Sequence, residues 1–256
     1  MAAPVKKSRP GTNAVRIGIG GWVFAPWRET FYPAGTRAAD FLPYASRQLT
    51  SIEVNATFYR TQSAATFRAW HDATPDGFVF ALKGPRAATQ VREAERAGVA
   101  VARFLGSGIT GLGDKLGPIA WQFPATRRFD AGELAAFLDL LLAEQEGRRL
   151  RHAIEAGHES FRSPECVALL RERGIARVLL GVDGDTEPAE TADFVYARLK
   201  GTVPDEAAGF GAAELDAWTA RIRGWSRERD CFVYVISGAK ARNPAAAREL
   251  IRRLSN

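Results

Sequence analysis

The sequence has little cysteine, little histidine and no long apolar run, and each shortage excludes a class of protein. Its 256 residues contain only two cysteines, Cys166 and Cys231, which are too few for a disulfide framework or a cysteine-based metal cluster. No apolar run approaches the roughly 18 residues of a membrane span. Residues 1–11 lack the apolar segment of a signal peptide. We therefore expect a cytoplasmic protein in a reducing compartment, with no membrane partner.

Lysine is scarce too, and arginine supplies most of the positive charge. Lysine and arginine together number 35 against 29 acidic residues, for a formal net charge of +6, and Lys6, Lys7 and Arg9 supply three of those charges. The remaining excess is typical of a solvated surface and points only weakly to nucleic acid. Guanidinium groups do suit the recognition of phosphate or carboxylate. We predict a disordered leader over residues 1–13 and a single domain over residues 14–256.

Short apolar segments alternate along the chain with segments whose apolar residues recur at helical spacing. The expected strands cover residues 16–20, 51–55, 78–83, 118–123, 152–156, 177–183, 194–200 and 231–237. The expected helices cover residues 38–49, 64–73, 89–105, 131–145, 164–173, 212–229 and 244–254. This alternation predicts an α/β fold of the TIM (β/α)8-barrel type. Residues 184–193 are too few for a full helical crossover, so we expect a shortened or missing helix between the sixth and seventh strands.

The rival architecture is an open, doubly wound sheet. Such sheets usually carry a Gly-x-Gly-x-x-Gly turn after the first strand, where a dinucleotide binds. No such fingerprint follows residues 16–20, which favours the barrel.

Polar residues gather at the carboxyl ends of the expected strands. Side chains alternate between the two faces of a strand, so Glu53 and Asn55 share one face, and Lys83 lies opposite Phe80 and Leu82. The strand-end residues are Glu53, Asn55, Lys83, Gln122, Glu155, Asp183, Arg198, Lys200 and Ser237. Catalytic groups of TIM barrels lie at this end, so we expect these side chains to surround one mouth. The alternative interpretation is that strand ends are polar wherever they meet solvent.

Four motifs resemble a known family. The first is Gly20-Gly21-Trp22 followed by Trp27 and residues 31–33 (Phe-Tyr-Pro), and the most specific is residues 53–60 (Glu-Val-Asn-Ala-Thr-Phe-Tyr-Arg). Residues 78–83 and residues 112–124 carry the other two. Together they are similar to the YecE-like family, domain of unknown function 72. The resemblance implies a TIM barrel without an established activity, and a suggested relationship to endonuclease IV-like barrels implies DNA or a sugar phosphate as the ligand.

The second half of the chain departs from the pattern of that family at three strand ends. Gly157 replaces an arginine and Phe161 replaces a tryptophan after the fifth strand. Lys200 replaces a histidine on the seventh strand, and Ser237 replaces an asparagine on the eighth. A shared substrate is therefore less secure than a shared fold. These departures favour the interpretation that the protein is a scaffold that kept the fold and lost its activity.

The strand-end residues predict roles in a binding or catalytic site. Glu53 and Glu155 are candidate acid–base carboxylates, and His158 is a candidate general acid or base near neutral pH. The candidate ligand-binding residues are Trp22, Asn55, Tyr59, Arg60, Lys83, Gln122, Asp183, Arg198 and Lys200. In the competing interpretation, both glutamates form buried ion pairs with Lys83 and Arg198 that stabilise the barrel and have no catalytic role. Whether the protein is an enzyme stays open.

A metal centre and a cofactor are not expected. The chain has three histidines, His71, His152 and His158, and only His158 is placed to ligate at the mouth. A multi-zinc cluster needs several converging histidines and acids. A single Mg²⁺ on Glu53, Glu155 and Asp183 is compatible with oxygen ligation, but no other residue supports it.

The alternative function is that of a nucleic-acid-binding barrel, with or without phosphodiester cleavage. The loops expected on the mouth side interleave arginines with aromatic residues, which suits phosphate contact together with base stacking. These residues are Arg28, Arg60, Arg86, Arg127, Arg128, Arg162, Trp22, Phe24, Trp27, Tyr59, Phe129 and Phe161. Acidic residues in the same loops dilute the positive field. The favoured function is binding, with or without hydrolysis, of a small phosphorylated or carboxylated ligand at the mouth, and the sequence leaves the oligomeric state open.

Overall fold

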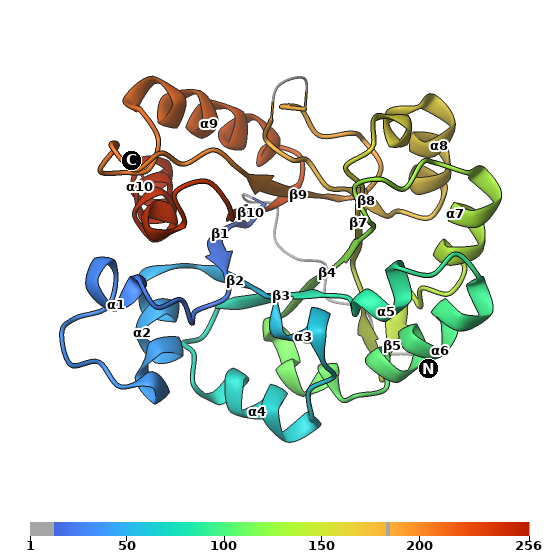
Figure 1. Ribbon diagram of the computed structural model, residues 1–256, viewed down its shortest axis with the longest axis horizontal. Coiled ribbons are helices and arrows are strands. Elements are labelled where there is room, and N and C mark those ends of the chain that lie inside the picture. The colour runs from blue at the N-terminus through green and yellow to red at the C-terminus, as the bar shows by residue number, and fades with distance from the viewer. Residues whose placement is uncertain (1–12, 183–184, 256) are drawn as a thin grey trace, which may run out of the picture.

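Eight parallel strands form one sheet that curls into a nearly closed barrel, with helices around its outside (Figure 1). The computed structural model describes residues 13–182 and 185–255. The strands follow one another in the order β8 (Ala176–Arg177), β7 (His152–Glu155), β4 (Leu116–Gln122), β3 (Val79–Lys83), β2 (Ser51–Val54), β1 (Val15–Gly20), β10 (Asp230–Val235) and β9 (Phe194–Leu199). This is the TIM-type α/β barrel that the alternation of segments predicts.

The barrel closes between β8 and β9 through one bridge that pairs Leu179 with Ala197. The N–H of Leu179 donates to the carbonyl of Tyr196 at 2.9 Å, and the N–H of Arg198 donates to the carbonyl of Leu179 at 2.8 Å. Regular pairing of β8 is therefore shorter than the expected strand over residues 177–183. The reason is Asp185, a buried carboxylate that accepts from the N–H of Leu180 at 2.7 Å, so this N–H does not pair with a neighbouring strand.

The connection from β8 to β9 contains no helix in the parts that the structure describes, residues 178–182 and 185–193. The guanidinium of Arg177 donates to Asp185 at 2.9 Å, so a buried ion pair holds this connection in place of a packed helix. Asp183 lies outside the described residues.

Ten α-helices in the described residues surround the barrel. They are α1 (Trp27–Thr30), α2 (Phe41–Gln48), α3 (Ala56–Tyr59), α4 (Ala64–Asp72), α5 (Arg86–Thr89), α6 (Ala94–Leu105), α7 (Ala131–Leu138), α8 (Pro164–Glu172), α9 (Ala212–Trp225) and α10 (Asn243–Ser255). Short 3-10 helices cover Ala38–Asp40, Ile109–Lys115, Glu159–Arg162 and Lys240–Arg242. Ser63, Asp130 and Ser163 cap α4, α7 and α8 by accepting a backbone N–H three residues on.

Two expected helices are wrong in extent. The segment 89–105 is broken into α5 and α6. The segment 131–145 ends at Leu138 and continues into a hairpin of β5 (Glu144–Gln145) and β6 (Arg148–Arg149). Glu146 and Gly147 have φ values of 50° and 73°, the left-handed conformation that a tight hairpin turn requires. That turn stops a helix from passing through this segment.

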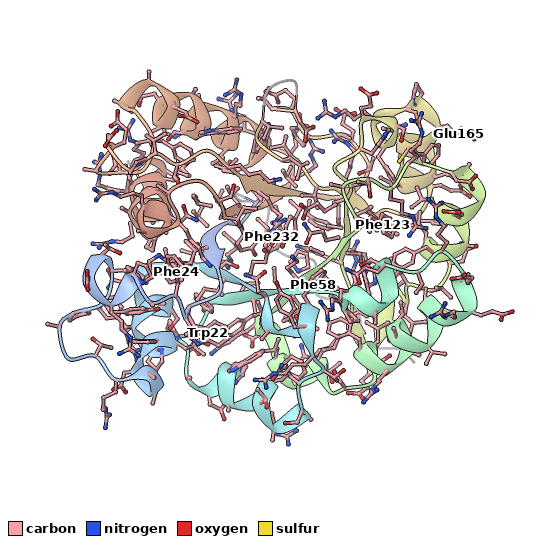
Figure 2. All side chains as sticks on the ribbon, viewed as in Figure 1. Trp22, Phe24, Phe58, Phe123, Glu165 and Phe232 are labelled. Atoms are coloured by element: carbon pink, nitrogen blue, oxygen red, sulfur yellow. The ribbon has the colours of Figure 1, made fainter. Side chains whose placement is uncertain are left out.

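The barrel has an inner core and an outer core. Inside, aromatic rings from β9 and β10 face alanines on the strands across the barrel, so that large side chains meet small ones. These residues are Phe194, Tyr196, Phe232, Tyr234, Ala81, Ala120, Ala153 and Ala176. Figure 2 shows Phe232 within the ring of strands. The larger outer core lies between the strands and the helices.

Asn13 is the last residue of the predicted leader and the first residue that the structure describes. Asn13, assigned from the sequence to the leader, donates its side-chain amide to the carbonyl of Ser226 at 3.1 Å. The rest of the leader, residues 1–12, lies outside the described residues. Within the described part, none of the helices has the length and apolar character needed to cross a bilayer.

Candidate functional site

Five strand-end residues form one connected polar network above the inner core. Lys83 donates to Gln122 at 2.6 Å, and Gln122 donates to Glu155 at 3.0 Å. Arg198 then donates to both Glu155 and Glu53, so the network joins β3, β4, β7, β9 and β2. The alternation of side chains predicts this convergence, and the structure places all five residues at the carboxyl ends of parallel strands.

Arg198 is the centre of this network. Its Nη2 lies 3.1 Å from Oε1 of Glu53, and its Nη1 donates to Oε2 of Glu155. Its Nε also lies 3.1 Å from Oε2 of Glu53 but is not aligned for a hydrogen bond. Although burial acts to lower it, the carboxylates of Glu53 and Glu155 raise the pKa of Arg198. Arg198 is therefore a permanently charged group held from two sides.

Glu53 is enclosed completely. Tyr196 donates its hydroxyl to Oε2 of Glu53 at 2.7 Å, and the side chain of Glu53 has no exposed surface. Burial, followed by the nearby charge of Glu53, raises the pKa of Tyr196, so the phenol stays a neutral donor. Sequence reasoning missed Tyr196, although the same alternation that selects Arg198 places Tyr196 on the inner face.

Lys83 is the second cation of the network. Burial, followed by the charge of Arg198, lowers the pKa of Lys83, whereas Glu53 and Glu155 raise it. Its ammonium lies 4.2 Å from the centre of the Phe58 ring. The network thus holds two cations and two carboxylates. Among the described residues, Arg198 forms the predicted ion pairs with both glutamates, whereas Lys83 bonds to Gln122 instead of a carboxylate.

A cavity of about 490 Å³ opens beside this network, and we call it the mouth pocket. Its lining comprises Gly20, Gly21, Trp22, Val23, Val54, Asn55, Ala56, Tyr59, Arg198, Ile236 and Lys240. Four predicted ligand-binding residues, Trp22, Asn55, Tyr59 and Arg198, are among them. Among the residues that the structure describes, no acidic residue lines the mouth pocket. Small side chains at its edge leave room for a ligand, since a Cβ on Gly20 would lie 3.0 Å from the amide nitrogen of Asn55.

Sequence reasoning missed Lys240. This residue begins a 3-10 helix after β10, and its ammonium lies 4.4 Å from the centre of the Phe24 ring and 5.6 Å from that of Trp27. The indole N–H of Trp27 donates to the carbonyl of Lys240 at 2.9 Å, which fixes the backbone. Lys240 forms no ion pair within the described part of the chain. No local sequence signal marks it, because tertiary contacts bring it to the pocket.

Other predicted residues lie away from the mouth pocket. His158 caps the 3-10 helix Glu159–Arg162, and its Nδ1 lies 2.9 Å from the hydroxyl of Ser160. Lys200 follows β9, is partly exposed and bonds to none of the described residues. Glu155, a carboxylate predicted at the mouth, is bonded to Gln122 and Arg198 and not to Lys200. Arg60 is exposed and lines a neighbouring cleft.

Two of the residues that depart from the family pattern, Gly157 and Ser237, have the following surroundings. Gly157 is exposed, and a Cβ there would lie 3.3 Å from that of Ala125. The carbonyl of Ser237 accepts from the hydroxyl of Thr202 at 2.8 Å, while its neighbour Ile236 lines the mouth pocket.

Across the described residues, His, Cys, Asp and Glu side chains form no group of three that could hold a metal ion.

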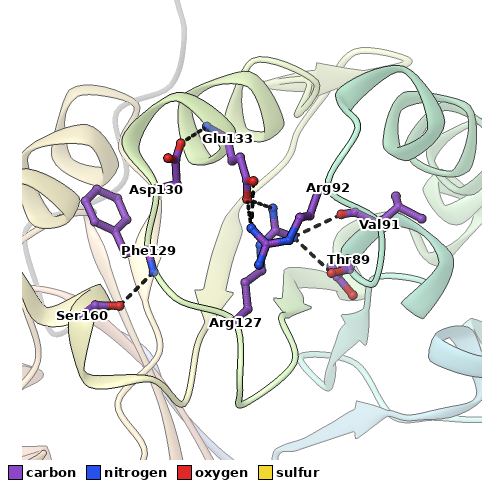
Figure 3. A network of polar contacts seen from close by, with 8 residues as sticks. All are labelled: Thr89, Val91, Arg92, Arg127, Phe129, Asp130, Glu133 and Ser160. Carbon is purple, nitrogen blue, oxygen red and sulfur yellow. Dashed lines mark hydrogen bonds and ion pairs between the residues drawn. The ribbon is translucent and has the colours of Figure 1, made fainter.

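Arg127, one of the loop arginines expected to meet nucleic acid, has a structural role. Its guanidinium donates to the carbonyls of Thr89 at 3.3 Å and Val91 at 3.2 Å, and to Glu133 at 3.1 Å (Figure 3). Arg92 bonds the same Glu133 from outside at 2.8 Å. Arg127 is 8% exposed and unavailable to a ligand.

Comparison with known proteins identifies the family and the fold. A family model described as "Protein of unknown function DUF72" matches residues 16–256. A DUF72 family protein from Thermotoga maritima is 21% identical, with a TM-score of 0.73 over 95% of this chain and 100% of the other. SacUVDE is 9% identical, with a TM-score of 0.58 over 94% and 98% of the two chains.

A xylose isomerase-like TIM barrel/4-hydroxyphenylpyruvate dioxygenase fusion protein is 15% identical, with a TM-score of 0.53 over 94% of this chain and 42% of the fusion. At these identities the solved structures support the barrel fold alone. No curated protein matches the chain.

Proposed function

We propose, from the premise that this chain belongs to the DUF72 family, that its mouth pocket binds a small anionic ligand carrying a phosphate or a carboxylate. The observation that carries the proposal is the charge of the pocket lining. Arg198 and Lys240 contribute two cations to the lining, and none of the described residues that line the cavity carries a carboxylate to pair with Lys240. A cavity of about 490 Å³ falls within the usual range of roughly 300–1,000 Å³ for small-molecule sites.

The two cations have different parts in this proposal. Glu53 and Glu155 already balance the charge of Arg198, so this guanidinium serves as a fixed hydrogen-bond donor. Lys240 is free to pair with the ligand, since only aromatic rings accompany its ammonium among the described residues. An anion bridging Lys240 and Arg198 would therefore gain a charge-assisted contact without displacing an internal partner.

The remaining lining suits the neutral body of the ligand. Trp22 and Tyr59 offer apolar ring faces, and Asn55 offers an amide that both donates and accepts hydrogen bonds. A sugar phosphate combines these features, because its ring packs against aromatic residues while its hydroxyls bond to amides.

Hydrolysis of the ligand is the stronger form of the proposal. It requires a carboxylate that can exchange a proton with the ligand or a water molecule. Glu155 suits this role better than Glu53, because its side chain keeps 5% exposure whereas that of Glu53 keeps none. If the network only specifies the barrel, neither glutamate exchanges a proton with the ligand, and the mouth pocket binds without hydrolysis.

A thermal-shift screen against phosphorylated and carboxylated metabolites tests the proposal. A ligand that binds only the native state raises the unfolding midpoint. We expect a hit with the parent protein and a smaller shift with the Lys240→Met variant at the same ligand concentration. A screen without hits, or hits whose shift does not depend on Lys240, would favour the inactive scaffold.

A further inference from the structure

A second cleft, of about 580 Å³, lies beside the mouth pocket. Its walls come from residues 58–61 at the end of α3, residues 85–91 around α5, and one face of α6. In Figure 1 these three helices lie on the side of the barrel that carries β3 and β4. Within the described part of the chain, no acidic residue lines the cleft, whereas four arginines do: Arg60, Arg86, Arg96 and Arg103. We call it the arginine cleft.

The charge of the arginine cleft is almost uncompensated. Arg60, Arg86 and Arg103 form no ion pair with any described residue. Arg96 approaches Glu93 at 3.8 Å, and both side chains are mostly exposed, so this contact contributes little. Several guanidinium groups without carboxylates concentrate a positive potential in a concave surface. Elsewhere on this protein, arginines such as Arg127 and Arg177 have acidic partners.

One face of α6 forms a wall of the cleft. Arg96, Val99, Ala100 and Arg103 line it, at the three- and four-residue spacing that brings side chains onto one side of a helix. The two arginines are separated by roughly 10 Å along the helix axis, from the rise of about 1.5 Å per residue. Val99 between them is 72% exposed. The wall therefore presents cations along its length, which suits an extended polyanion better than one phosphate group.

Tyr59 stands where the two cavities meet. Its side chain is 68% exposed, and it lines both the arginine cleft and the mouth pocket. Phe58 contacts Tyr59 edge to face at 5.2 Å, and the guanidinium of Arg86 lies 5.8 Å from the centre of the Tyr59 ring. An exposed ring supported in this way is a stacking platform for an unpaired base.

The wall of the arginine cleft formed by residues 85–91 is held in place by a buried arginine behind it. Arg127 fixes the carbonyls of Thr89 and Val91, which end α5 and lead towards α6 (Figure 3). Glu133 at the start of α7 anchors Arg127 in turn. The segment between α5 and α6 is therefore ordered by a buried arginine, and ligand binding need not order it.

We infer that the arginine cleft binds single-stranded nucleic acid, with successive phosphates on its arginines and an unpaired base stacked on Tyr59. A cationic groove combined with an exposed aromatic ring is the arrangement that single strands require. A duplex offers no free base to Tyr59, and a sulfated polysaccharide offers no aromatic face. The inference goes beyond the small-ligand site, because it uses a different cavity and holds whether or not the mouth pocket binds a metabolite.

Fluorescence anisotropy with a labelled oligothymidylate, measured over a range of salt concentrations, tests the inference. For single strands the logarithm of the binding constant falls with that of the salt concentration, with a slope of about −0.7 per phosphate contact. The Arg96→Gln/Arg103→Gln variant should bind at least about tenfold more weakly at low salt and reduce the slope by about 1.4. The matched control is Arg227→Gln/Arg248→Gln, which removes the same charge from exposed arginines near α9 and α10 and should bind like the parent.

Substitutions of Tyr59 test the stacked base. Tyr59→Leu should weaken binding by about fivefold or more, whereas Tyr59→Phe should keep it, because stacking needs the ring and not the hydroxyl. Lys240→Met should leave oligothymidylate binding unchanged, which separates this site from the mouth pocket.

Three results would overturn the inference. One is equal weakening by the cleft variant and its matched control, which would mean general charge attraction. Another is equal affinity for a duplex or for heparin, which would remove the preference for unpaired bases. The third is an absence of binding at low salt by a parent protein whose thermal unfolding shows that it is folded.

Discussion

The guanidinium of Arg198 and the carboxylate of Glu53 form an enclosed ion pair inside the barrel, with Nη2 3.1 Å from Oε1. Breaking such a pair leaves a buried charge without its full compensation, which typically costs about 3–5 kcal/mol. Glu53→Gln should therefore lower the free energy of unfolding by about 3 kcal/mol in urea denaturation. The exposed Glu165, which Figure 2 labels on α8, is the control, and Glu165→Gln should change stability by less than about 0.5 kcal/mol.

The same variant separates a structural role from a ligand-binding role for Glu53. If Glu53→Gln retains the stability of the parent but loses the thermal shift by a ligand, the carboxylate belongs to the binding machinery. The ion-pair interpretation of Glu53 would then be wrong.

Two lysines compete for the role of anion anchor at the mouth. The sequence places Lys200 among the candidate ligand-binding residues, whereas the mouth pocket is lined by Lys240. A charge-assisted contact contributes about 1.5–3 kcal/mol, or roughly ten- to a hundredfold in affinity. Lys240→Met should lose that factor for an anionic hit in calorimetry at fixed salt, and Lys200→Met should change affinity by less than about threefold. A larger loss of affinity in Lys200→Met than in Lys240→Met would place the ligand near the end of β9 instead of beside Lys240.

His152 should make stability fall in mild acid. The indole N–H of Trp121 donates to its Nδ1 at 3.1 Å, and its Nε2 lies 2.7 Å from the carbonyl of Leu142, so the neutral ring satisfies both contacts. Burial lowers the pKa of His152 to about 4, although the bond to Leu142 acts to raise it. The unfolded chain then takes up a proton first, so the free energy of unfolding declines as the pH falls from about 6.5 to about 4, by about 3 kcal/mol in all.

Urea denaturation at both ends of that pH window measures the effect. His152→Gln should remove about 3 kcal/mol of the difference between the two pH values. His158→Asn, which keeps a capping acceptor outside the core, should leave the difference unchanged. An identical pH dependence in His152→Gln and the parent would assign the acid sensitivity to other groups.

Two glycines should respond to alanine in opposite directions. A Cβ on Gly18 of β1 would lie 1.9 Å from the carbonyl oxygen of Ser51, within the backbone of the neighbouring strand β2. Gly18→Ala should therefore destabilise by about 3 kcal/mol or reduce the yield of folded protein. Gly224 in α9 meets no atom within 4 Å, so Gly224→Ala should stabilise by about 0.5–1 kcal/mol. Thermal denaturation of both variants measures the contrast, and similar shifts would mean that β1 and β2 can separate without cost.

Local alternation along strands accounts for what could be read from the sequence. It places Glu53, Lys83, Gln122, Glu155 and Arg198 on the inner face near strand ends, and the barrel brings such positions together regardless of the details of packing. The same reasoning fails where tertiary contacts decide. Arg127 lies in a loop and is buried because it meets carbonyls on another element, and Lys240 reaches the pocket through a contact with Trp27.

One error was open to local reasoning. Residues 131–145 have apolar residues at helical spacing, but Glu146 and Gly147 form the turn of a hairpin directly after them. Gly147 is the local signal for this turn and competes with the helical pattern, although the residue before it is a glutamate and not the asparagine or aspartate usual in such hairpins. The role of His158 was not open to local reasoning. A histidine at a strand end can cap a helix or exchange protons, and the sequence does not distinguish the two roles.

The pairing of β1 with β10 sets the order in which the chain can fold as it is synthesised. Val15 of β1 pairs with Cys231 and Ile19 pairs with Val235, so the strand made first waits for the strand made last. Until β10 emerges, the growing barrel also lacks Phe232 and Tyr234 from its inner core. Pairings of such long sequence separation form slowly, and unpaired strand edges invite aggregation. A chain truncated before β10 would expose one edge of β1, so the barrel cannot close until β10 has been synthesised.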